Sequence, residues 1–507
     1  MPTERAAILE NAKYLREIRP LDPAEIADYV ESRPHPAVVR QVIREEALAL
    51  RVIERDDDTF VPVSEEPVSP RRETVRALPT RIEDRLETLL VERYGPDWPA
   101  GESGERLRAA IRDLKRRYHR GAPVEYGPDA AAGYALYHLP AYYASVHYVL
   151  EDLAERALLD RHLRVLDVGA GVGGPALGLF EYLPSDALVE YHAIEPGDGA
   201  TILESLLETT GPNVHARIHR QPIEETCLDG LGTGGSFDLV LAANVCSELE
   251  DPARVIQRCL EACSPEGSLV MTAPADRRTS IQLRELERSL EESAGATVYG
   301  PTVRLWPGER PSDLGWTFDV RPDLEVPGFQ QRLDAAASTD PEHEPGEFLN
   351  VDVQFAYSIL RRDGTRRIDL ELDPGRFARM AEMDRHVTNR IDLVAAKLSP
   401  ALRPGGTELL GPTGTPGRSL RDARGTNDGS ASTRAGEGPN PIFKISDGSE
   451  RVDHYAVLTV ETALNRALLA ADYGDVVRFE AVLVLWNDDE EAYNLVVDEE
   501  TIVDPVA

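Results

Sequence analysis

The chain has 507 residues, which is too long for a single hydrophobic core, so two to four domains are expected. Its 89 acidic and 55 basic residues give a formal net charge of −34, and its hydrophobic content of 42% excludes a chain that is disordered throughout. Only four of the basic residues are lysine, a composition typical of cytoplasmic proteins that work in molar salt, where a Debye length of about 3 Å keeps the net charge from excluding an RNA partner.

The sequence contains no signal-peptide core and no run of eighteen apolar residues. We therefore expect a soluble cytoplasmic protein that does not span a membrane.

Residues 1–64 predict a helical domain that resembles a winged helix. One helix begins after Asp22, a second covers 36–50, and the runs 51–54 and 60–63 pair as a hairpin. Such modules bind nucleic acid or protein. Both uses stay open, because the second helix carries few basic residues.

Residues 65–130 predict a linker followed by a basic helical region. Over 105–120, apolar residues recur at helical spacing and mark a buried stripe, while seven basic residues stand against two acidic ones. One interpretation is a surface that tracks RNA phosphates, with Arg112, Arg116 and Arg117 facing outward. The alternative is a solvated face whose charges pair with acids elsewhere in the fold.

Residues 131–400 predict the main α/β domain, and its most informative part is the glycine-rich stretch 165–174. A buried strand there breaks into a loop with glycine at every other position, and such a backbone can turn tightly and lie against a ligand. An open α/β sheet holds nucleoside-bearing cofactors at this place. The candidate cofactor contacts in this stretch are Asp167, Gly169, Ala170, Gly171 and Gly173. The aromatic-rich helix predicted over 134–150 is expected to pack over this domain rather than to stack on bases.

The elements that follow alternate between strands and helices. Strand-like runs lie at 188–194, 214–218, 237–244 and 267–272, with a helical run at 200–208. The alternation predicts a parallel, right-handed, doubly wound sheet. Glu195 ends a strand at the distance where an acidic side chain accepts hydrogen bonds from ribose hydroxyls. Glu224 lies where the adenine is usually held, and Asn244 either lines the site or caps its strand.

The loop sequence D-V-G-A-G-V-G-G looks more like the S-adenosylmethionine (SAM) loop of class I methyltransferases than like a dinucleotide fingerprint. Three further elements, the Y-x-x-x-x-L-P-x-x-Y-A stretch before the loop, N-V-x-S-E-L at 244–249 and the strand-like run 353–362, resemble the methyltransferase-like assembly factors of the mitochondrial small ribosomal subunit and their bacterial and archaeal relatives. The resemblance covers 131–366 and, more faintly, the C-terminal region. It implies SAM as cofactor, with Asp167 near its ammonium group, and the small ribosomal subunit or its rRNA as partner.

The sequence departs from that family in one respect. Members can carry cysteines after the fifth strand that hold an iron–sulfur cluster, but the stretch 299–318 contains none, so neither a cluster nor another metal is expected. The four cysteines of the chain match no zinc spacing and are expected to be mainly structural. Cys246 lacks the preceding proline of a 5-methylcytosine nucleophile, and no catalytic residue is assigned.

The C-terminal region predicts a helix over 376–399, a low-complexity linker over 401–440 and a small β-rich domain over 441–507. Strand-like runs in this domain lie at 455–460, 476–486 and 493–497, around a short helix near 461–469. A barrel that binds RNA is one interpretation of this domain.

Three functions remain open on this sequence. The chain is expected to be an RNA-directed SAM-dependent methyltransferase, a SAM-binding ribosome-assembly factor without turnover, or a small-molecule methyltransferase. The third needs a compact acceptor lid and no RNA-binding modules, whereas candidate modules lie at both ends of this chain. The first two are not separable by sequence.

Overall fold

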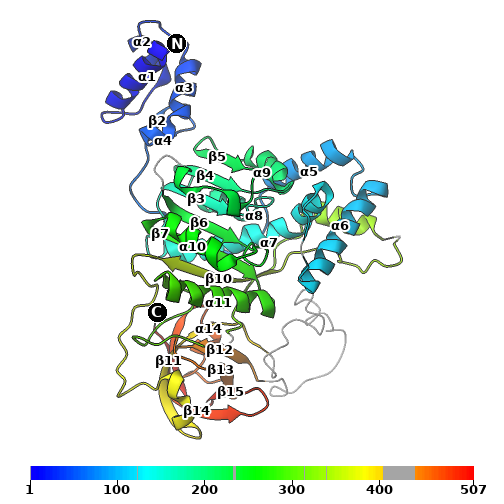
Figure 1. The fold of residues 1–507 in the computed structure, drawn as a ribbon, viewed down its shortest axis with the longest axis vertical. Coiled ribbons are helices and arrows are strands. Elements are labelled where there is room, and N and C mark those ends of the chain that lie inside the picture. The colour runs from blue at the N-terminus through cyan, green and yellow to red at the C-terminus, as the bar shows by residue number, and fades with distance from the viewer. Residues whose placement is uncertain are drawn as a thin grey trace.

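A computed structural model describes residues 2–122, 124–231, 236–312, 315–338, 340–402 and 440–506. Figure 1 shows an N-terminal module at one end, an α/β sheet with its helices in the middle, a helical arm beside the sheet, and a β-barrel at the other end. Except for residues 401, 402 and 440, the predicted linker 401–440 lies outside the described residues. Within the described ranges, every helix falls short of the length and hydropathy that a membrane crossing needs.

The N-terminal module has the expected helices followed by a hairpin. Its elements are α1 (Pro2–Leu15), α2 (Pro23–Tyr29), α3 (Pro36–Glu45), α4 (Ala47–Leu50), β1 (Val52–Glu54) and β2 (Phe60–Pro62). The Asp22 side chain caps α2 by accepting a hydrogen bond from the backbone N–H of Ala24 at 2.8 Å. A bridge from Leu21 to Phe60 adds a third, one-residue strand to the β1–β2 pair, which is the arrangement of a winged helix.

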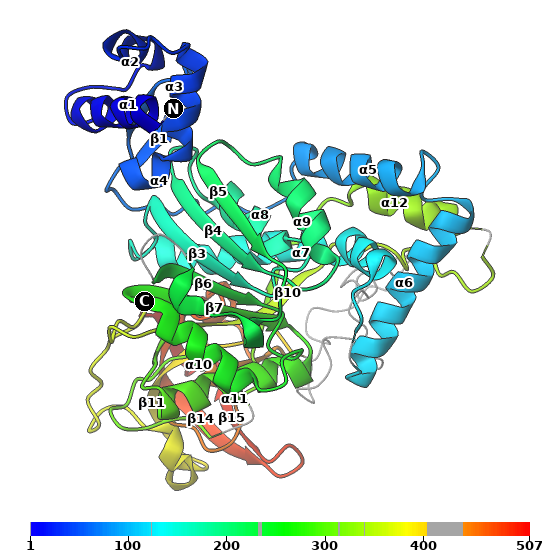
Figure 2. The same cartoon turned by 45° about the horizontal axis from the view of Figure 1, so that its top comes forward.

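The helical arm lies on one side of the sheet (Figure 2). It consists of α5 (Thr80–Tyr94), α6 (Gly101–Arg120), α7 (Pro128–Ala154) and α12 (Gly328–Ala336). The aromatic-rich helix α7 is buried along most of its length and shares an apolar cluster with the sheet, so the expectation that it packs over the α/β domain is confirmed.

The central sheet contains β3 (His162–Val168), β4 (Leu188–Ile194), β5 (Val214–His219), β6 (Phe237–Ala243), β7 (Cys263–Pro274), β8 (Thr297–Gly300), β9 (Asp319–Arg321) and β10 (Val353–Arg361). The strand order is β5-β4-β3-β6-β7-β10-β8, and the first five strands are parallel. The expected doubly wound sheet is therefore confirmed. β10 runs antiparallel between β7 and β8, and β9 pairs with its start.

Helices cover both faces of this sheet. They are α8 (Gly174–Tyr182), α9 (Gly199–Leu207), α10 (Pro252–Ala262) and α11 (Arg277–Ser293), with short 3-10 turns at η1 (Ile223–Glu225) and η2 (Leu228–Gly230). α7, α8 and α9 share one apolar cluster, whereas α10 and α11 share another on the opposite face. Strand order reverses between β3 and β6, and open α/β sheets bind ligands at such a switch point.

The C-terminal domain is a closed barrel. It consists of β11 (Arg390–Lys397), β12 (Ile442–Ser446), β13 (His454–Leu458), β14 (Val476–Asn487) and β15 (Ala492–Val497), with α14 (Ala467–Ala470) between the third and fourth strands and β16 (Ile502–Pro505) paired outside β14. The ring closes in the order β11-β12-β13-β15-β14-β11, and only β13 and β15 pair in parallel. This five-stranded topology is that of an OB fold.

The helix expected over 376–399 is wrong. The segment forms a 3-10 turn, η3 (Met380–His386), and then strand β11. Leu393 points into the barrel core, whereas Val394 packs in the cluster of the α/β domain. Because both faces of the strand are buried from Leu393 onward, residues 393–396 are all apolar and hide the alternation that marks a strand. The barrel therefore begins before residue 400, and 401–440 lies between its first two strands rather than between domains.

Residues 303–306, within the cysteine-free stretch 299–318, hold the barrel against the α/β domain. Trp306 Nε1 donates to Asp447 Oδ2 at 2.8 Å, and the Leu305 N–H donates to the Asp447 carbonyl oxygen at 3.1 Å. A Cβ on Gly448 would lie 2.1 Å from the carbonyl oxygen of Val303, so the two backbones touch there. In this chain the stretch is an interdomain contact.

Candidate active site

A cavity of about 360 Å³ lies at the carboxyl ends of β3, β4 and β6. Its described lining residues are Val124, Tyr126, Ala131, Tyr134, Gly169, Gly171, Val172, Ile194, Glu195, Pro196, Gly197, Gly199, Pro222, Ile223, Glu224, Ala243, Asn244, Val245, Glu248 and Leu249. The cavity therefore lies at the switch point of the sheet.

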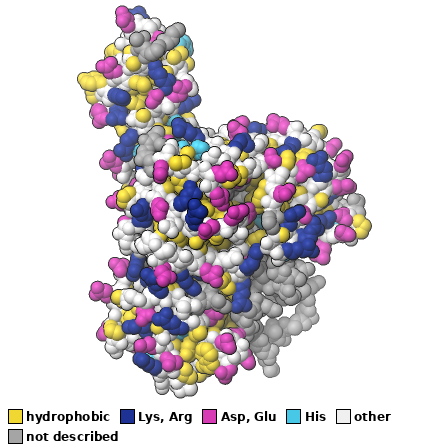
Figure 3. All heavy atoms as spheres, in the orientation of Figure 1, with side chains coloured by type: hydrophobic (Ala, Val, Ile, Leu, Met, Phe, Trp, Pro, Cys, Tyr) yellow, Lys and Arg dark blue, Asp and Glu magenta, His cyan; other side chains and the backbone are white. Residues whose placement is uncertain are grey.

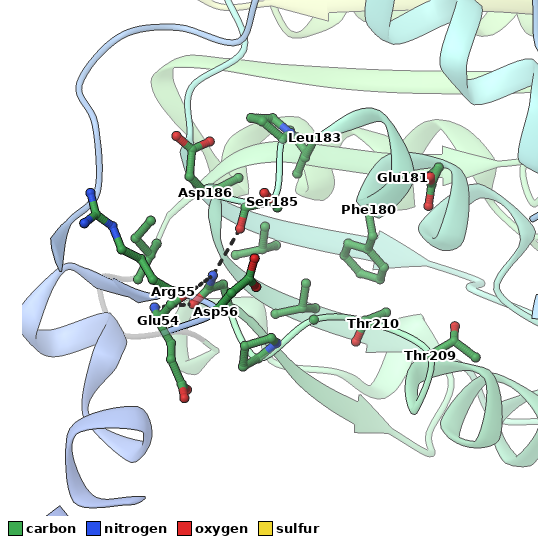
Figure 4. A pocket seen from close by; sticks show the side chains of 18 of the residues that line it. Glu54, Arg55, Asp56, Phe180, Glu181, Leu183, Ser185, Asp186, Thr209 and Thr210 are labelled. Atoms are coloured by element: carbon green, nitrogen blue, oxygen red, sulfur yellow. Dashed lines mark hydrogen bonds between the residues drawn. The ribbon is translucent and has the colours of Figure 1, made fainter. Parts of the chain in front are cut away.

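Two hollows of about 1000 Å³ or more lie elsewhere. One, of about 1170 Å³, separates the N-terminal hairpin from the edge of the sheet (Figure 4). At its base Asn213 accepts a hydrogen bond from the Glu54 N–H at 2.8 Å and donates to the carbonyl oxygens of Glu54 and Ser185, at 3.1 Å each. The other, of about 1000 Å³, lies between α7 and the barrel. Both are open seams between domains and lie away from the carboxyl ends of the strands, so we assign the site to the cavity at the ends of β3, β4 and β6.

The glycine loop needs its glycines for different reasons. Gly169, Gly171 and Gly173 have φ values of +66°, +55° and +89°, which L side chains rarely adopt. A Cβ on Gly169 would lie 2.4 Å from Val245 Cγ2, and one on Gly173 would lie 2.5 Å from Leu203 Cδ1. A Cβ on Gly171 would face open space in the cavity wall, because its nearest neighbour would be the Gly169 carbonyl oxygen at 3.9 Å. A ligand can therefore approach the backbone at Gly171.

Glu195 is held in the cavity wall by the glycine loop. One carboxylate oxygen accepts a hydrogen bond from the Gly171 N–H at 2.8 Å, and the other accepts one from the Gly197 N–H at 2.7 Å. The side chain lines the cavity but is only 8% exposed, so its orientation is fixed before any ligand arrives. Each oxygen keeps a lone pair that can accept from a hydroxyl group.

Asp167 does not reach the cavity, contrary to the expected contact with the ammonium group of SAM. Its carboxylate accepts a hydrogen bond from Tyr191 Oη at 2.7 Å, and the residue is 1% exposed. The reason is its place within β3, where side chains project perpendicular to the sheet rather than beyond the strand end. Burial raises the pKa of Asp167 to about 7. Ala170 and Gly173 also lie outside the described lining and serve the turn into α8.

Glu224 and Asn244, in contrast, meet Glu195 around the cavity. Glu224 lies on η1 in the far wall. Asn244 has φ +57°, a conformation that asparagine tolerates, and its N–H donates to the Thr272 carbonyl oxygen at 3.0 Å. Asn244 also lines a second cavity of about 400 Å³ between the ends of β6 and β7 and helices α10 and α11. Asn244 therefore lies between the two cavities.

Sequence reasoning missed the contributions of Tyr126 and Glu248. Tyr126 Oη donates to Glu248 Oε1 at 2.7 Å, and the Tyr126 carbonyl oxygen accepts from the Asp198 N–H at 3.2 Å. The loop before α7 thus crosses the cavity and ties two strand-end loops together. Desolvation, with a smaller contribution from Glu195, raises the pKa of the Glu248 carboxyl. Glu248 belongs to the N-V-x-S-E-L element, so a sequence signal for it exists, whereas Tyr126 lies in a loop without any recognisable sequence motif.

The arginines proposed to contact RNA are paired within the fold. Arg112 binds Glu347 at 2.6 Å and Asp340 at 3.0 Å, so it does not face outward as expected. Arg116 and Arg117 bind Asp113 on their own helix at 2.5 and 2.7 Å. Figure 3 shows acidic side chains beside the basic ones on the helical arm. Arg112 therefore fits the paired-face interpretation, whereas the side chains of Arg116 and Arg117 are 54% and 45% exposed and face outward as expected.

The cysteines show no sign of catalytic activation. Cys227 is exposed, and Cys259 and Cys263 are buried in the core. Cys246 lines the second cavity, and burial raises the pKa of its thiol to about 12, so the thiolate needed for nucleophilic attack is scarce at neutral pH. Among the described residues, no group of three or more His, Cys, Asp or Glu side chains is arranged to hold a metal ion.

Three family models match parts of the chain. Residues 166–269 match a methyltransferase domain. Residues 5–56 and 428–506 match the N-terminal and C-terminal domains of a domain of unknown function, DUF8157. A search of curated proteins gave no match.

Among solved structures, a SAM-dependent methyltransferase from Clostridium acetobutylicum is similar at 15% identity and a TM-score of 0.21, over 29% of this chain and 54% of its own length. This chain thus spans about half of that protein. A precorrin-6y C5,15-methyltransferase from Geobacter metallireducens is similar at 19% identity and a TM-score of 0.22, over 27% of this chain and 65% of that one. The plantazolicin methyltransferase BpumL, solved with S-adenosylhomocysteine (SAH), is similar at 12% identity and a TM-score of 0.26, over 55% of this chain and 98% of that one.

The methyltransferase model spans the chain from inside β3 to the middle of β7, and so includes the glycine loop, Glu195 and Asn244. Together with the parallel sheet and its switch point, this match identifies the architecture, whereas the ribosomal assembly-factor family finds no support in these comparisons. The middle of this chain has the fold of the class I SAM-dependent methyltransferases.

Proposed function

We propose that the chain binds SAM in the cavity at the ends of β3, β4 and β6 and transfers its methyl group to an acceptor. The observation that carries the proposal is Glu195, which backbone N–H groups hold in the wall of a cavity whose glycine loop leaves room for a ligand. A carboxylate fixed in this way is suited to the ribose hydroxyls of a nucleoside.

The charges around the cavity favour SAM over a dinucleotide or a nucleoside triphosphate. Its described lining contains the carboxylates of Glu195, Glu224 and Glu248 and neither lysine nor arginine. A phosphate group would meet like charge there, whereas SAM carries a sulfonium and an ammonium group. Residues Pro222 and Ile223 supply an apolar wall beside Glu224 for the adenine.

When bound, SAM supplies an electrophilic methyl group. The chain's own residues then have to hold the two reactants in line, because methyl transfer gains most from positioning and a general base is optional. Glu195 and the glycine loop fix one side of the cavity, and Asn244 and Glu248 line the side toward the second cavity.

Titration calorimetry of the full chain with SAM, at high salt, tests the proposal. Glu195→Gln keeps the side-chain volume but removes the charge, and it should weaken SAM binding by about 1–3 kcal/mol, the usual cost of losing hydrogen bonds to a charged group. Glu204→Gln is the matched control, because Glu204 lies on α9, is 69% exposed and binds Arg220 outside the cavity. Unchanged affinity in Glu195→Gln, or no SAM binding by the parent chain, would refute the proposal.

A second candidate partner is the rRNA of the small ribosomal subunit, as the sequence resemblance implies. The chain would then either methylate this RNA or assist assembly of the subunit without turnover. The OB topology of the barrel favours it, since such barrels bind oligonucleotides through their second and third strands and adjoining loops. Against it, Ile442 and Tyr455 on those strands pack in the same cluster as Phe318 of the α/β domain, and the loop 488–491 is entirely acidic. Co-sedimentation with small-subunit particles tests this candidate, and SAH release in their presence separates methylation from assembly.

A further inference from the structure

One face of α7 presents an accessible row of rings beside the cofactor cavity. Tyr134, His138 and Tyr142 follow one another at single-turn spacing and stay partly exposed, whereas most of α7 is buried. The rings of Tyr134 and His138 lie 4.8 Å apart, and His138 stacks on Tyr142 at 5.4 Å with an interplanar angle of 11°. The row is therefore a preformed aromatic face, in which the Tyr134 ring is tilted by 43° from the ring of His138.

This surface lies on the acceptor side of the cavity. Tyr134 lines the cavity itself, and its ring meets that of Tyr126 edge to face at 5.6 Å. Tyr142 packs beside the turn from the glycine loop into α8, because a Cβ on Gly174 would lie 3.2 Å from its Cβ. Burial, together with Glu248 and Asp276, raises the pKa of the Tyr142 hydroxyl. Glu248 follows β6 and Asp276 follows β7, the two strands whose ends flank the second cavity.

The electrostatic character of this region selects against anions. Neither the cofactor cavity nor the second cavity has lysine or arginine among its described lining residues. Aromatic faces attract cations through their negative ring charge. Burial, with a smaller contribution from Lys115, lowers the pKa of His138 to about 3, so its ring is neutral at physiological pH. Lys115 lies outside both linings: its ammonium group is 4.0 Å from the centre of the Tyr137 ring and donates to the Glu347 carbonyl oxygen at 2.6 Å. Within the described ranges, no hydrogen bond joins the ring nitrogens of His138 to another residue.

We propose that the aromatic face of α7 and Glu248 together bind the methyl acceptor, and that this acceptor is an ammonium group carried on a planar ring. The inference rests on the proposed function. The ring of the acceptor would lie against the edges of the stacked His138 and Tyr142 rings, and its ammonium group would pair with Glu248. An acceptor held by a phosphate backbone finds no cation in these two linings to receive it.

Glu248 and SAM together supply the proton acceptor and the methyl group that this transfer needs. Glu248 takes one proton from the ammonium group, and the lone pair that is freed on nitrogen forms the new N–CH3 bond. The S–CH3 bond of SAM breaks at the same time, and its electron pair stays on sulfur, which leaves SAH. The methylated amine departs as a cation, and Glu248 returns its proton to water.

Binding of benzylamine, which is cationic at pH 7.5, tests the inference on the full chain saturated with SAH. Ligand-observed NMR should show that benzylamine binds and that benzoate, which has the same ring and the opposite charge, does not. His138→Leu and Tyr142→Leu should each weaken benzylamine binding at least tenfold while the SAH affinity stays within twofold, because neither residue belongs to the described lining of the cofactor cavity. Tyr14→Leu is the matched control, since Tyr14 is 70% exposed on α1.

Equal binding of benzoate, no binding of benzylamine to the SAH complex, or unchanged affinity in both leucine variants would overturn the inference. Methylation of small-subunit rRNA without methylation of benzylamine would overturn it as well, in favour of RNA. A parent chain that does not bind SAH would instead overturn the proposed function, so the two failures are distinguishable.

Discussion

Asp167 should make the stability of the sheet fall as pH rises. Its ordinary pKa of 3.8 is raised to about 7 in the fold, chiefly by desolvation, with Glu195 adding to the effect and the Tyr191 hydroxyl opposing it. A carboxyl whose pKa is raised by folding favours the native state in its protonated form. The contribution of Asp167 to the stability of the native state is therefore complete below about pH 4 and is lost as pH rises through about 7.

The size of this effect follows from the shift. About three pKa units at 1.36 kcal/mol each give about 4 kcal/mol over the whole range, of which about 2–3 kcal/mol falls between pH 5 and pH 8. Because Asp167 is 1% exposed, solvent screening does not reduce the figure. Asp167→Asn removes the titration, so the variant should lack this part of the pH dependence.

Hydrogen exchange of the amides of β3, followed by mass spectrometry from pH 5 to pH 8 and corrected for intrinsic rates, measures the free energy of opening this part of the sheet. A local probe is needed because a chain of several domains has no single unfolding free energy. Asp229→Asn, at an exposed position on η2, is the control. A parent chain and an Asp167→Asn variant with the same pH dependence would refute the reasoning.

Three further predictions concern other parts of the molecule. Gly169→Ala should lower the melting temperature more than Gly171→Ala, because its Cβ would lie 2.4 Å from Val245 Cγ2 whereas a Cβ on Gly171 meets open space. Gly171→Ala should weaken SAM binding, since its Cβ would occupy space that the ligand needs; thermal melts and calorimetry compare the variants, and equal melting temperatures or an unchanged SAM affinity in Gly171→Ala would count against the packing argument. Arg112→Ala should lower the melting temperature by about 2–4 °C, because it leaves Glu347 and Asp340 without their partner, and an unchanged melt would mean that the pair adds nothing to stability. Iodoacetamide at pH 8 should alkylate the exposed Cys227 well before Cys246, because the pKa of the Cys246 thiol is raised to about 12. Peptide mass spectrometry measures the order of alkylation, and the reverse order would indicate an activated thiol at Cys246.

The central strands were predictable because their signals are local. β4 coincides with the expected run 188–194, and β6 ends one residue before the expected end. Buried parallel strands are short apolar runs bounded by turn residues, and the glycines after β3 mark a backbone that only glycine adopts readily. The same locality explains the N-terminal module, where Asp22 caps a helix as its position indicates.

Other features depend on contacts that the sequence does not display. The reversed direction of β10 is set by its neighbours β7 and β8, and no residue in the strand encodes it. The sequence of β11 shows no strand pattern, because burial on both faces from Leu393 onward removes the alternation. Asp167 was expected in the site because it precedes the glycine loop, but the pleat of β3 directs its side chain to Tyr191. The partners of Arg112 lie more than 200 residues away, so a helical pattern shows its charge but not its ion pairs.

The central claim is that the cavity at the ends of β3, β4 and β6 is the SAM site. Hydrogen exchange of the full chain with and without saturating SAH tests it most directly, because the readout reports where the ligand binds and needs no acceptor. The account predicts slower exchange in the peptides that cover 169–173, 195–199, 222–224 and 244–249, with no change in the hairpin peptide 52–62. Protection confined to the hairpin seam or to the hollow between α7 and the barrel would contradict it, as would unchanged exchange throughout.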